Sequence, residues 1–128
     1  MSSRATHKVH VDEANTLVEW TLDGLFSVAD IQAFERDTLA SYERLGGKGI
    51  RVLSDVRRFK PVSPEVTEAI RGMQERAMRA GVVRAAQVIE SATVALQLNR
   101  VAHEAGLDAV LRRFSDVDEA RRWLLSPL

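Results

Sequence analysis

Apolar and polar residues alternate in two short runs near the start of the chain. The first run covers residues 7–12 and the second covers residues 17–23, and the turn-prone residues 13–15 join them. From Val18 to Leu22 every second residue is apolar, which places these side chains on one side of an extended strand. The pattern predicts a β-hairpin with one buried face.

After the hairpin, apolar residues recur at the three- and four-residue steps of amphipathic helices. Ser27 begins the first of these helices, with Asp30 in the position of a capping box, and Gly46 and Gly47 end it. Three further helices are predicted, over residues 63–80, over residues 91–105 and from Ser115 onward. Each of them has one apolar stripe, so each is expected to pack on a sheet.

Strand-like runs separate these helices, at residues 50–56, 84–90 and 109–114. Strands that alternate with helices pair in parallel through right-handed crossovers, because a tight turn cannot reach a parallel neighbour. The element order ββαβαβαβα predicts an α/β fold with a mostly parallel five-stranded sheet and an antiparallel hairpin at its edge. The 128 residues have the size of a single domain, 1–128, in which residues 1–6 are expected to form a flexible tail.

The composition is that of an ordinary globular protein, with 45% hydrophobic and 28% charged residues. The chain has 18 basic and 18 acidic residues, so no overall field favours nucleic acid, and none is expected as a partner. Cysteine is absent, which excludes disulfides and thiolate sites and fits a reducing compartment. Without a signal-like start or a long apolar run, the protein is expected to be cytoplasmic.

Catalytic and metal-binding patterns are absent from the sequence. His7 and His10 lie three residues apart on a strand and so face opposite sides, while His103 stands alone on a helix. Neither a nucleophile with an activating neighbour nor a glycine-rich phosphate loop is found. We therefore expect no catalytic centre, no metal and no cofactor.

The element order, together with the turn Phe114-Ser115-Asp116 into Glu119-Ala120-Arg121-Arg122-Trp123-Leu124, resembles the SpoIIAA-like branch of the STAS (anti-sigma-factor antagonist) superfamily. The likeness covers nearly the whole chain. It implies a small α/β domain that works by binding, as a non-enzymatic regulatory module whose partner is another protein or a second copy in a homodimer.

The same resemblance leaves a second function open. SpoIIAA-like domains resemble the CRAL-TRIO lipid-transfer fold, which implies binding or carriage of a small apolar or lipid-like ligand, with peripheral membrane association. Such a ligand needs an apolar cleft between helices and sheet. The small residues Ala85 and Ala86 in the fourth strand would leave room for it, or they simply allow close packing.

Ser63 is the one candidate phosphorylation site. In phosphorylated STAS antagonists, a serine in an Asp-Ser-Ser-Gly-like turn begins the helix after the third strand. Here the corresponding stretch, residues 62–65, reads Val-Ser-Pro-Glu, so the serine is in place but the aspartate and glycine are missing. Serine before proline is also a strong helix-start signal, and Ser63 is expected to cap its helix.

Asp55 and the basic residues Arg57, Arg58 and Lys60 are a candidate contact site for an anion or an acidic partner. They stand near the carboxyl ends of parallel strands, where ligands of open α/β sheets bind. The alternative is that these charged side chains are only solvated in a loop and contact no partner. Asp55 is expected to accept loop N–H groups or to face Arg57 or Arg58.

Asp55 also invites comparison with response-regulator receivers, in which an aspartate ends the third strand. The chain offers Asp23 and Ser91 near other strand ends, but it has Arg112-Arg113-Phe114 where receivers carry a lysine. It also begins with a hairpin. The receiver is therefore the weaker comparison.

Leu96 is the candidate for an interface. It lies on the helix face opposite Leu98 and shares that face with Asn99 and His103. If Leu98 faces the core, Leu96 is exposed and bordered by polar groups. Leu96 and His103 are therefore the expected contact with a partner or a second copy, although single exposed leucines are common.

Overall fold

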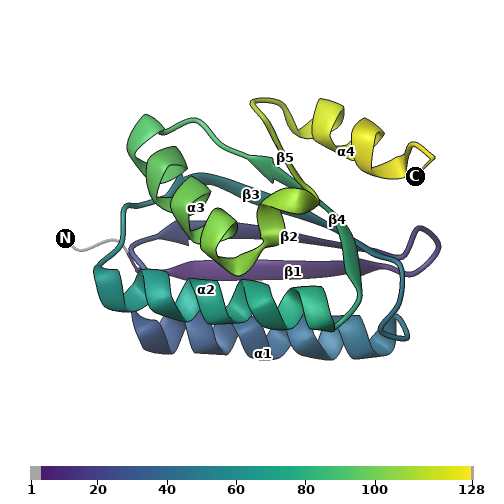
Figure 1. Ribbon diagram of the computed structural model, residues 1–128, viewed down its shortest axis with the longest axis horizontal. Helices are drawn as coiled ribbons and strands as arrows, with labels where there is room; N and C mark the ends of the chain where they lie inside the picture. The colour runs from purple at the N-terminus through teal and green to yellow at the C-terminus, as the bar shows by residue number, and fades with distance from the viewer. Residues whose placement is uncertain (1–3, 128) are drawn as a thin grey trace.

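The predicted strands form one mixed sheet (Figure 1). The computed structural model describes residues 4–127. The strands are β1 (Thr6–Asp12), β2 (Leu17–Gly24), β3 (Ile50–Phe59), β4 (Val82–Val88) and β5 (Leu111–Phe114), and they lie in sequence order across the sheet. β1 pairs with β2 in antiparallel fashion, and every other pair is parallel. The predicted α/β fold with an edge hairpin is confirmed.

The opening hairpin is fixed by its turn and its register. Asp12 accepts hydrogen bonds from the backbone N–H and the side-chain amide of Asn15, at 3.3 and 2.8 Å. This is the local bonding by which aspartate stabilises turns. In the resulting register Val9 lies opposite Trp20, so the two residues share one face of the sheet.

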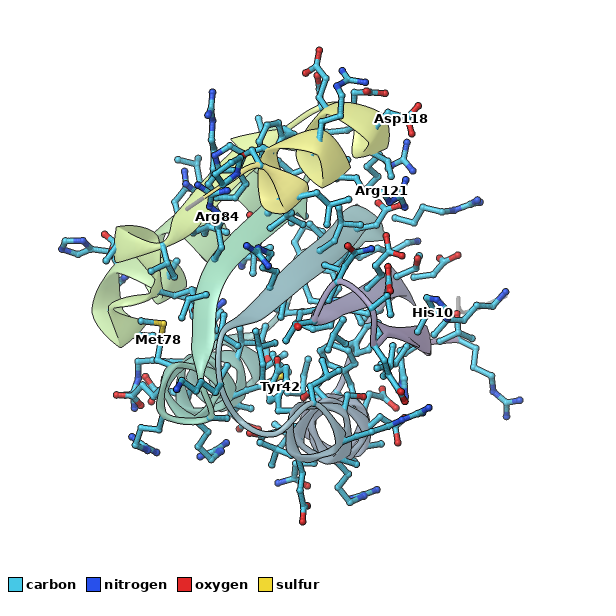
Figure 2. The ribbon with its side chains drawn as sticks, turned by 90° about the vertical axis from the view of Figure 1, so that its right-hand side faces the viewer. His10, Tyr42, Met78, Arg84, Asp118 and Arg121 are labelled. Carbon is cyan, nitrogen blue, oxygen red and sulfur yellow. The ribbon has the colours of Figure 1, made fainter. Side chains whose placement is uncertain are left out.

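Four α-helices cover the two faces of this sheet unequally. They are α1 (Val28–Arg44), α2 (Pro64–Arg79), α3 (Ala92–Ala105) and α4 (Val117–Leu125), and a short 3₁₀ helix, η1 (Leu107–Ala109), follows α3. Figure 2 shows α1 and α2 end-on on one side of the sheet, with α4 on the other side. Because α4 packs mainly on β3, β4 and β5, the hairpin end of that face is left uncovered by helices.

The larger part of the core lies between the sheet and helices α1, α2 and α3. Alternate residues of the strands enter it, together with the apolar stripes of the helices; its members include Leu22, Phe34, Val56, Ile70 and Leu98. The smaller part lies under α4 and includes Leu17, Leu53, Ala86, Ala120 and Leu124. Apolar residues at helical spacing on the inner faces of α1 and α3 are buried, as the single apolar stripe of each helix predicts, except that Leu45 and Ala105 are only partly buried.

Several boundaries differ from the prediction, and β4 covers Val82–Val88 where the sequence predicted residues 84–90. β3 continues to Phe59, so Arg57 and Arg58 belong to the strand and not to the loop after it. η1 occupies the start of the expected fifth strand. Asp116, not Ser115, caps α4, because the carboxylate of Asp116 accepts the N–H of Glu119 at 2.9 Å.

The expected tail at residues 1–6 overlaps the first strand. Thr6 begins β1, and Ala5 packs against the larger core. The expectation for residues 1–3 lies outside the described residues.

Candidate functional site

Three helices begin at the same end of the sheet, where the parallel strands finish (Figure 1, left). Each begins with a serine whose hydroxyl accepts a backbone N–H: Ser27 for α1, Ser63 for α2 and Ser91 for α3. The predicted capping box of Ser27 and Asp30 is present. Because helix N-termini carry partial positive charge, this edge favours negatively charged groups.

Ser63 caps α2, as predicted. Its hydroxyl accepts the N–H of Val66 at 3.4 Å, which is a long hydrogen bond, and Pro64 occupies the first helical turn. The Ser63 residue itself is exposed. The hydroxyl therefore stabilises the start of the helix while remaining open to solvent.

The loop before α2 is held on both sides. Gln97 of α3 accepts the N–H of Val62 at 3.0 Å and donates to the Val62 carbonyl at 2.9 Å. On the other side, the N–H of Lys60 donates to the carbonyl of Gly24 at 3.1 Å. Hydrogen bonds thus connect the loop before α2 to the end of β2 and to α3.

The acidic and basic candidates are largely paired with each other. The Arg57 guanidinium donates to both carboxylate oxygens of Asp55, at 2.9 and 2.7 Å, and the Arg57 N–H bonds the same carboxylate at 3.2 Å. This pairing, which confirms the expected contact, holds the pKa of Asp55 below its usual range. Arg58 lies 3.4 Å from Asp23, an exposed pair. Among residues 4–127, Lys60 is the member of the cluster without an ionic partner.

Two leucines beside this edge are unusually exposed. Leu96, in the second turn of α3, has 73% of its surface exposed, and Leu25, directly after β2, has 55%. Leu98 is buried, so the predicted exposure of Leu96 is confirmed. His103 is also exposed and lies 2.8 Å from Asp108. We define the carboxyl-edge surface as Leu25, Arg58, Lys60, Ser63 and Leu96.

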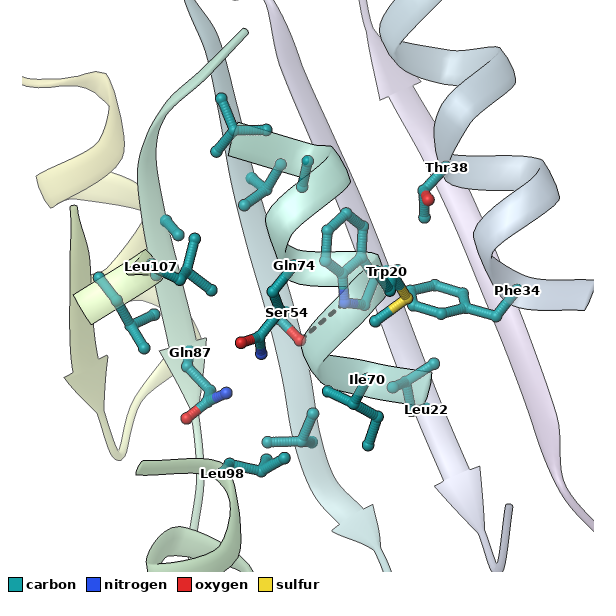
Figure 3. A pocket seen from close by; sticks show the side chains of 18 of the residues that line it. Trp20, Leu22, Phe34, Thr38, Ser54, Ile70, Gln74, Gln87, Leu98 and Leu107 are labelled. Carbon is teal, nitrogen blue, oxygen red and sulfur yellow. Dashed lines mark hydrogen bonds between the residues drawn. The ribbon is translucent and has the colours of Figure 1, made fainter. Parts of the chain in front are cut away.

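A cavity of about 70 Å³ lies inside the core between the sheet and the helices (Figure 3). Its walls are mostly apolar and include Phe34, Ile70, Leu98 and Leu107, and both Ala85 and Ala86 line it. Tyr42 also lines it, and burial raises the pKa of the Tyr42 hydroxyl, which keeps it protonated. No charged side chain is among the described residues that line this cavity.

Three polar side chains lie close together in the cavity wall: Ser54 of β3, Gln74 of α2 and Gln87 of β4, here called the polar centre. Ser54 accepts a 2.7 Å hydrogen bond from the indole N–H of Trp20. The side-chain oxygens of Gln74 and Gln87 are buried without a hydrogen-bond partner in the part of the chain described. An unsatisfied buried acceptor costs about 1–3 kcal/mol, so two in one cavity require an explanation.

The described residues contain no group of three or more histidine, aspartate or glutamate side chains arranged to hold a metal ion. None of the described helices has the length and apolar character to cross a membrane.

The family model described as SpoIIAA-like matches residues 17–125. The chain belongs to the SpoIIAA-like family. The resemblance drawn from the element order and the terminal turn is thus confirmed, as is the fold that it implied. No curated protein matches the chain in sequence.

Solved structures show the same fold for this SpoIIAA-like chain at low sequence identity. An anti-sigma factor antagonist from Mycobacterium paratuberculosis matches 98% of the chain and 100% of its own, with 13% identity and a TM-score of 0.63. The protein TM1081, solved by NMR, matches 97% of the chain and 98% of its own, with 12% identity and a TM-score of 0.59. Similarity over nearly the full length of these chains shows that they share this fold.

Sequence reasoning missed the residues that organise the two regions. Gln97 gave no signal because a polar residue on a helix flank is normally solvated. Gln74 lies four residues after Ile70 on a helix, and Gln87 lies two residues after Ala85 on a strand. The helical and strand periodicities therefore predict that both glutamines are buried, as they are. Only the convergence of β3, β4 and α2 brings these two glutamines to Ser54 (Figure 3).

Proposed function

We propose that this protein is a non-enzymatic regulatory module that binds another protein through the carboxyl-edge surface. Membership of the SpoIIAA-like family supports a regulatory, protein-binding role. The observation that carries the location is the exposure of Leu25 and Leu96, beside loops that hydrogen bonds tie to the sheet and to α3. Exposed apolar groups on a rigid, polar-rimmed scaffold are typical of protein interfaces.

The charges of this surface favour an acidic partner. Arg58 is mostly exposed and Lys60 has no ionic partner among the described residues, while the positive ends of three helices lie at the same edge. Asp55 and Arg57 neutralise each other, so neither of them offers an unpaired charge to a partner. We propose that they shape the end of β3, and that Arg58 and Lys60 meet the partner.

A protein of the anti-sigma-factor type is the first partner to test, because one solved neighbour is described as an anti-sigma factor antagonist. Phosphorylation of Ser63 would act on this contact. The hydroxyl is exposed at a helix N-terminus, which favours a phosphate, whereas the neighbouring Glu65 opposes one. The added charge would alter the attraction between this surface and an acidic partner.

The test is affinity purification of the tagged protein from its own cells, followed by measurement of Kd with the purified partner. Leu96→Glu and Lys60→Glu should each weaken binding by tenfold or more, as expected for interface anchors. Leu39→Glu is the matched control, since Leu39 is a partly exposed leucine on α1 away from this edge. Equal binding by all three variants would contradict the proposed surface.

Carriage of an apolar or lipid-like ligand is the second candidate, and the interior cavity is the observation that favours it. Its volume of about 70 Å³ is roughly half the 150 Å³ of an engineered cavity that binds benzene. A lipid chain would therefore require α2 to separate from the sheet. Native mass spectrometry of protein purified without detergent tests this function: a bound lipid mass supports it, and the bare chain mass contradicts it. Co-sedimentation with lipid vesicles tests the accompanying membrane association.

A further inference from the structure

The polar centre lies inside the core, so the carboxyl-edge surface does not need it for binding. Ser54, Gln74 and Gln87 come from three different elements and point toward one another (Figure 3). Gln74 has 8% and Gln87 has 5% of its surface exposed. An apolar side chain at either position would fill the core without leaving a polar group unsatisfied.

The polar centre offers both kinds of hydrogen-bonding group. The side-chain oxygens of Gln74 and Gln87 are buried without a hydrogen-bond partner among residues 4–127, and each side-chain amide also carries two N–H donors. Ser54 already accepts from Trp20, so its own hydroxyl hydrogen is available to donate. A molecule in this place would therefore be recognised by acceptors and donors together.

We propose that the cavity is a binding site for a small uncharged molecule that both donates and accepts hydrogen bonds, of the class of primary amides and short alcohols. Charge is excluded because no charged side chain lines the cavity to offset the cost of burying an ion. A purely apolar ligand is disfavoured because it would leave both glutamine oxygens unsatisfied.

The cavity volume sets the size of the ligand. At about 70 Å³ it has room for roughly two water molecules, each of which occupies about 30 Å³ in the liquid. A ligand of a few non-hydrogen atoms fills this space, with its apolar part against Ile70 and Leu98 and its polar group at the polar centre. So small a molecule binds in the millimolar range, and it would bridge α2 to β3 and β4.

Three molecules of nearly equal shape test the proposal. Acetamide has a donor and an acceptor, acetone has only the acceptor, and acetate is charged. Each is titrated into the wild-type protein while NMR follows the methyl groups of Ile70, Leu98 and Leu107 and the indole N–H of Trp20. We expect saturable shifts with acetamide, binding weaker by about tenfold with acetone because the donor is missing, and no saturable shift with acetate.

Substitution of the glutamines provides the second arm. Gln74→Met and Gln87→Met keep the length of the side chain and remove its polar group, so both variants should lose saturable acetamide binding. Gln32→Met is the matched control, because Gln32 is exposed on α1, and it should bind acetamide as the wild type does.

Two results would overturn the proposal. In the first, acetamide gives only linear shifts, which would mean that water alone serves the polar centre, or all three molecules give the same response, which would mean that the polar centre does not select the ligand. In the second, Gln87→Met and Gln74→Met bind acetamide as the wild type does. The titrations of the wild-type protein still test the proposal if a glutamine variant fails to fold.

Discussion

Gln97 on α3 holds Val62 through two reciprocal hydrogen bonds, one to its N–H and one to its carbonyl, across 35 positions of sequence. The contact fixes the loop that leads from β3 into α2. Lys60 and Ser63 both belong to this loop, so their positions depend on a side chain of another helix. The rigidity of the carboxyl-edge surface is thus a tertiary property.

Replacement of Gln97 by alanine should therefore loosen this loop. The change removes two hydrogen bonds to partly buried backbone groups, so we expect unfolding free energy to fall by about 1–3 kcal/mol. Hydrogen exchange at the Val62 amide should become faster at the same time. Asn99→Ala, at an exposed position of the same helix, is the control and should change neither quantity. Unchanged exchange at Val62 in Gln97→Ala would show that the loop is held by other contacts.

Ser63 can be tested separately as a cap and as a switch. Because its hydroxyl accepts the Val66 N–H, Ser63→Ala should lower stability by about 0.5–2 kcal/mol, and the 3.4 Å distance favours the lower end. Ser63→Asp should be tolerated, since aspartate also caps well. Urea unfolding of both variants measures these changes in the free energy of unfolding. Partner binding that survives alanine but is lost with aspartate would instead support a phosphorylation switch.

Glu35 and Arg76 join α1 to α2 through a two-pronged ion pair, with distances of 2.6 and 2.7 Å. Gly72 makes room for it, because a Cβ there would lie 3.2 Å from both terminal nitrogens of Arg76. Arg76→Ala leaves the buried Glu35 carboxylate unpaired and should cost about 1–3 kcal/mol in chemical denaturation. Arg71→Ala, which removes surface pairs on the same helix, should have little effect. Additive effects in a Glu35/Arg76 double-mutant cycle would contradict this coupling.

The Asp55–Arg57 pair predicts a pH dependence. The pKa of Asp55 is lowered in the folded protein by its hydrogen bonds with Arg57, so the carboxylate stabilises the fold at any pH above the ordinary aspartate pKa. This contribution is lost as the pH falls through the lowered folded-state pKa. Urea unfolding of wild type and Asp55→Asn should therefore differ at neutral pH and converge in strong acid. Asp118→Asn, at a carboxylate with 76% of its side chain exposed, is the control. A constant difference across this range would show that Asp55 acts without its charge.

The order of the helices and strands could be predicted from the sequence, because each element has its own local pattern of residues. Alternation gave the hairpin, and helical spacing with Ser27, Ser63 and Ser91 gave three helix starts. Errors arose where two local solutions compete. Ser115 and Asp116 both cap well, and only the structure shows which of their side chains reaches the N–H of Glu119.

The candidate site was less predictable, because its decisive contacts join distant segments. Asp55 and Arg57 are two residues apart, and their contact followed from the sequence. The contacts of Gln97 with Val62 and of Trp20 with Ser54 span more than thirty residues. Such pairs are set by how helices pack on the sheet, and a single sequence does not encode that register in any local pattern.

Leu96 provides the last prediction, which concerns self-association. Its side chain stands in solvent at the second turn of α3, with Asn99 and His103 beside it, and a second copy could cover this apolar spot. Leu96→Glu should leave the fold and its thermal transition unchanged, because no core contact is lost, while shifting a dimer to monomer in sedimentation. Leu125→Glu, at an exposed leucine on α4, is the control and should leave the assembly state as it is. If Leu96→Glu sediments as the wild type does, α3 is not a self-association surface, and the exposed leucine is then available to a different protein partner.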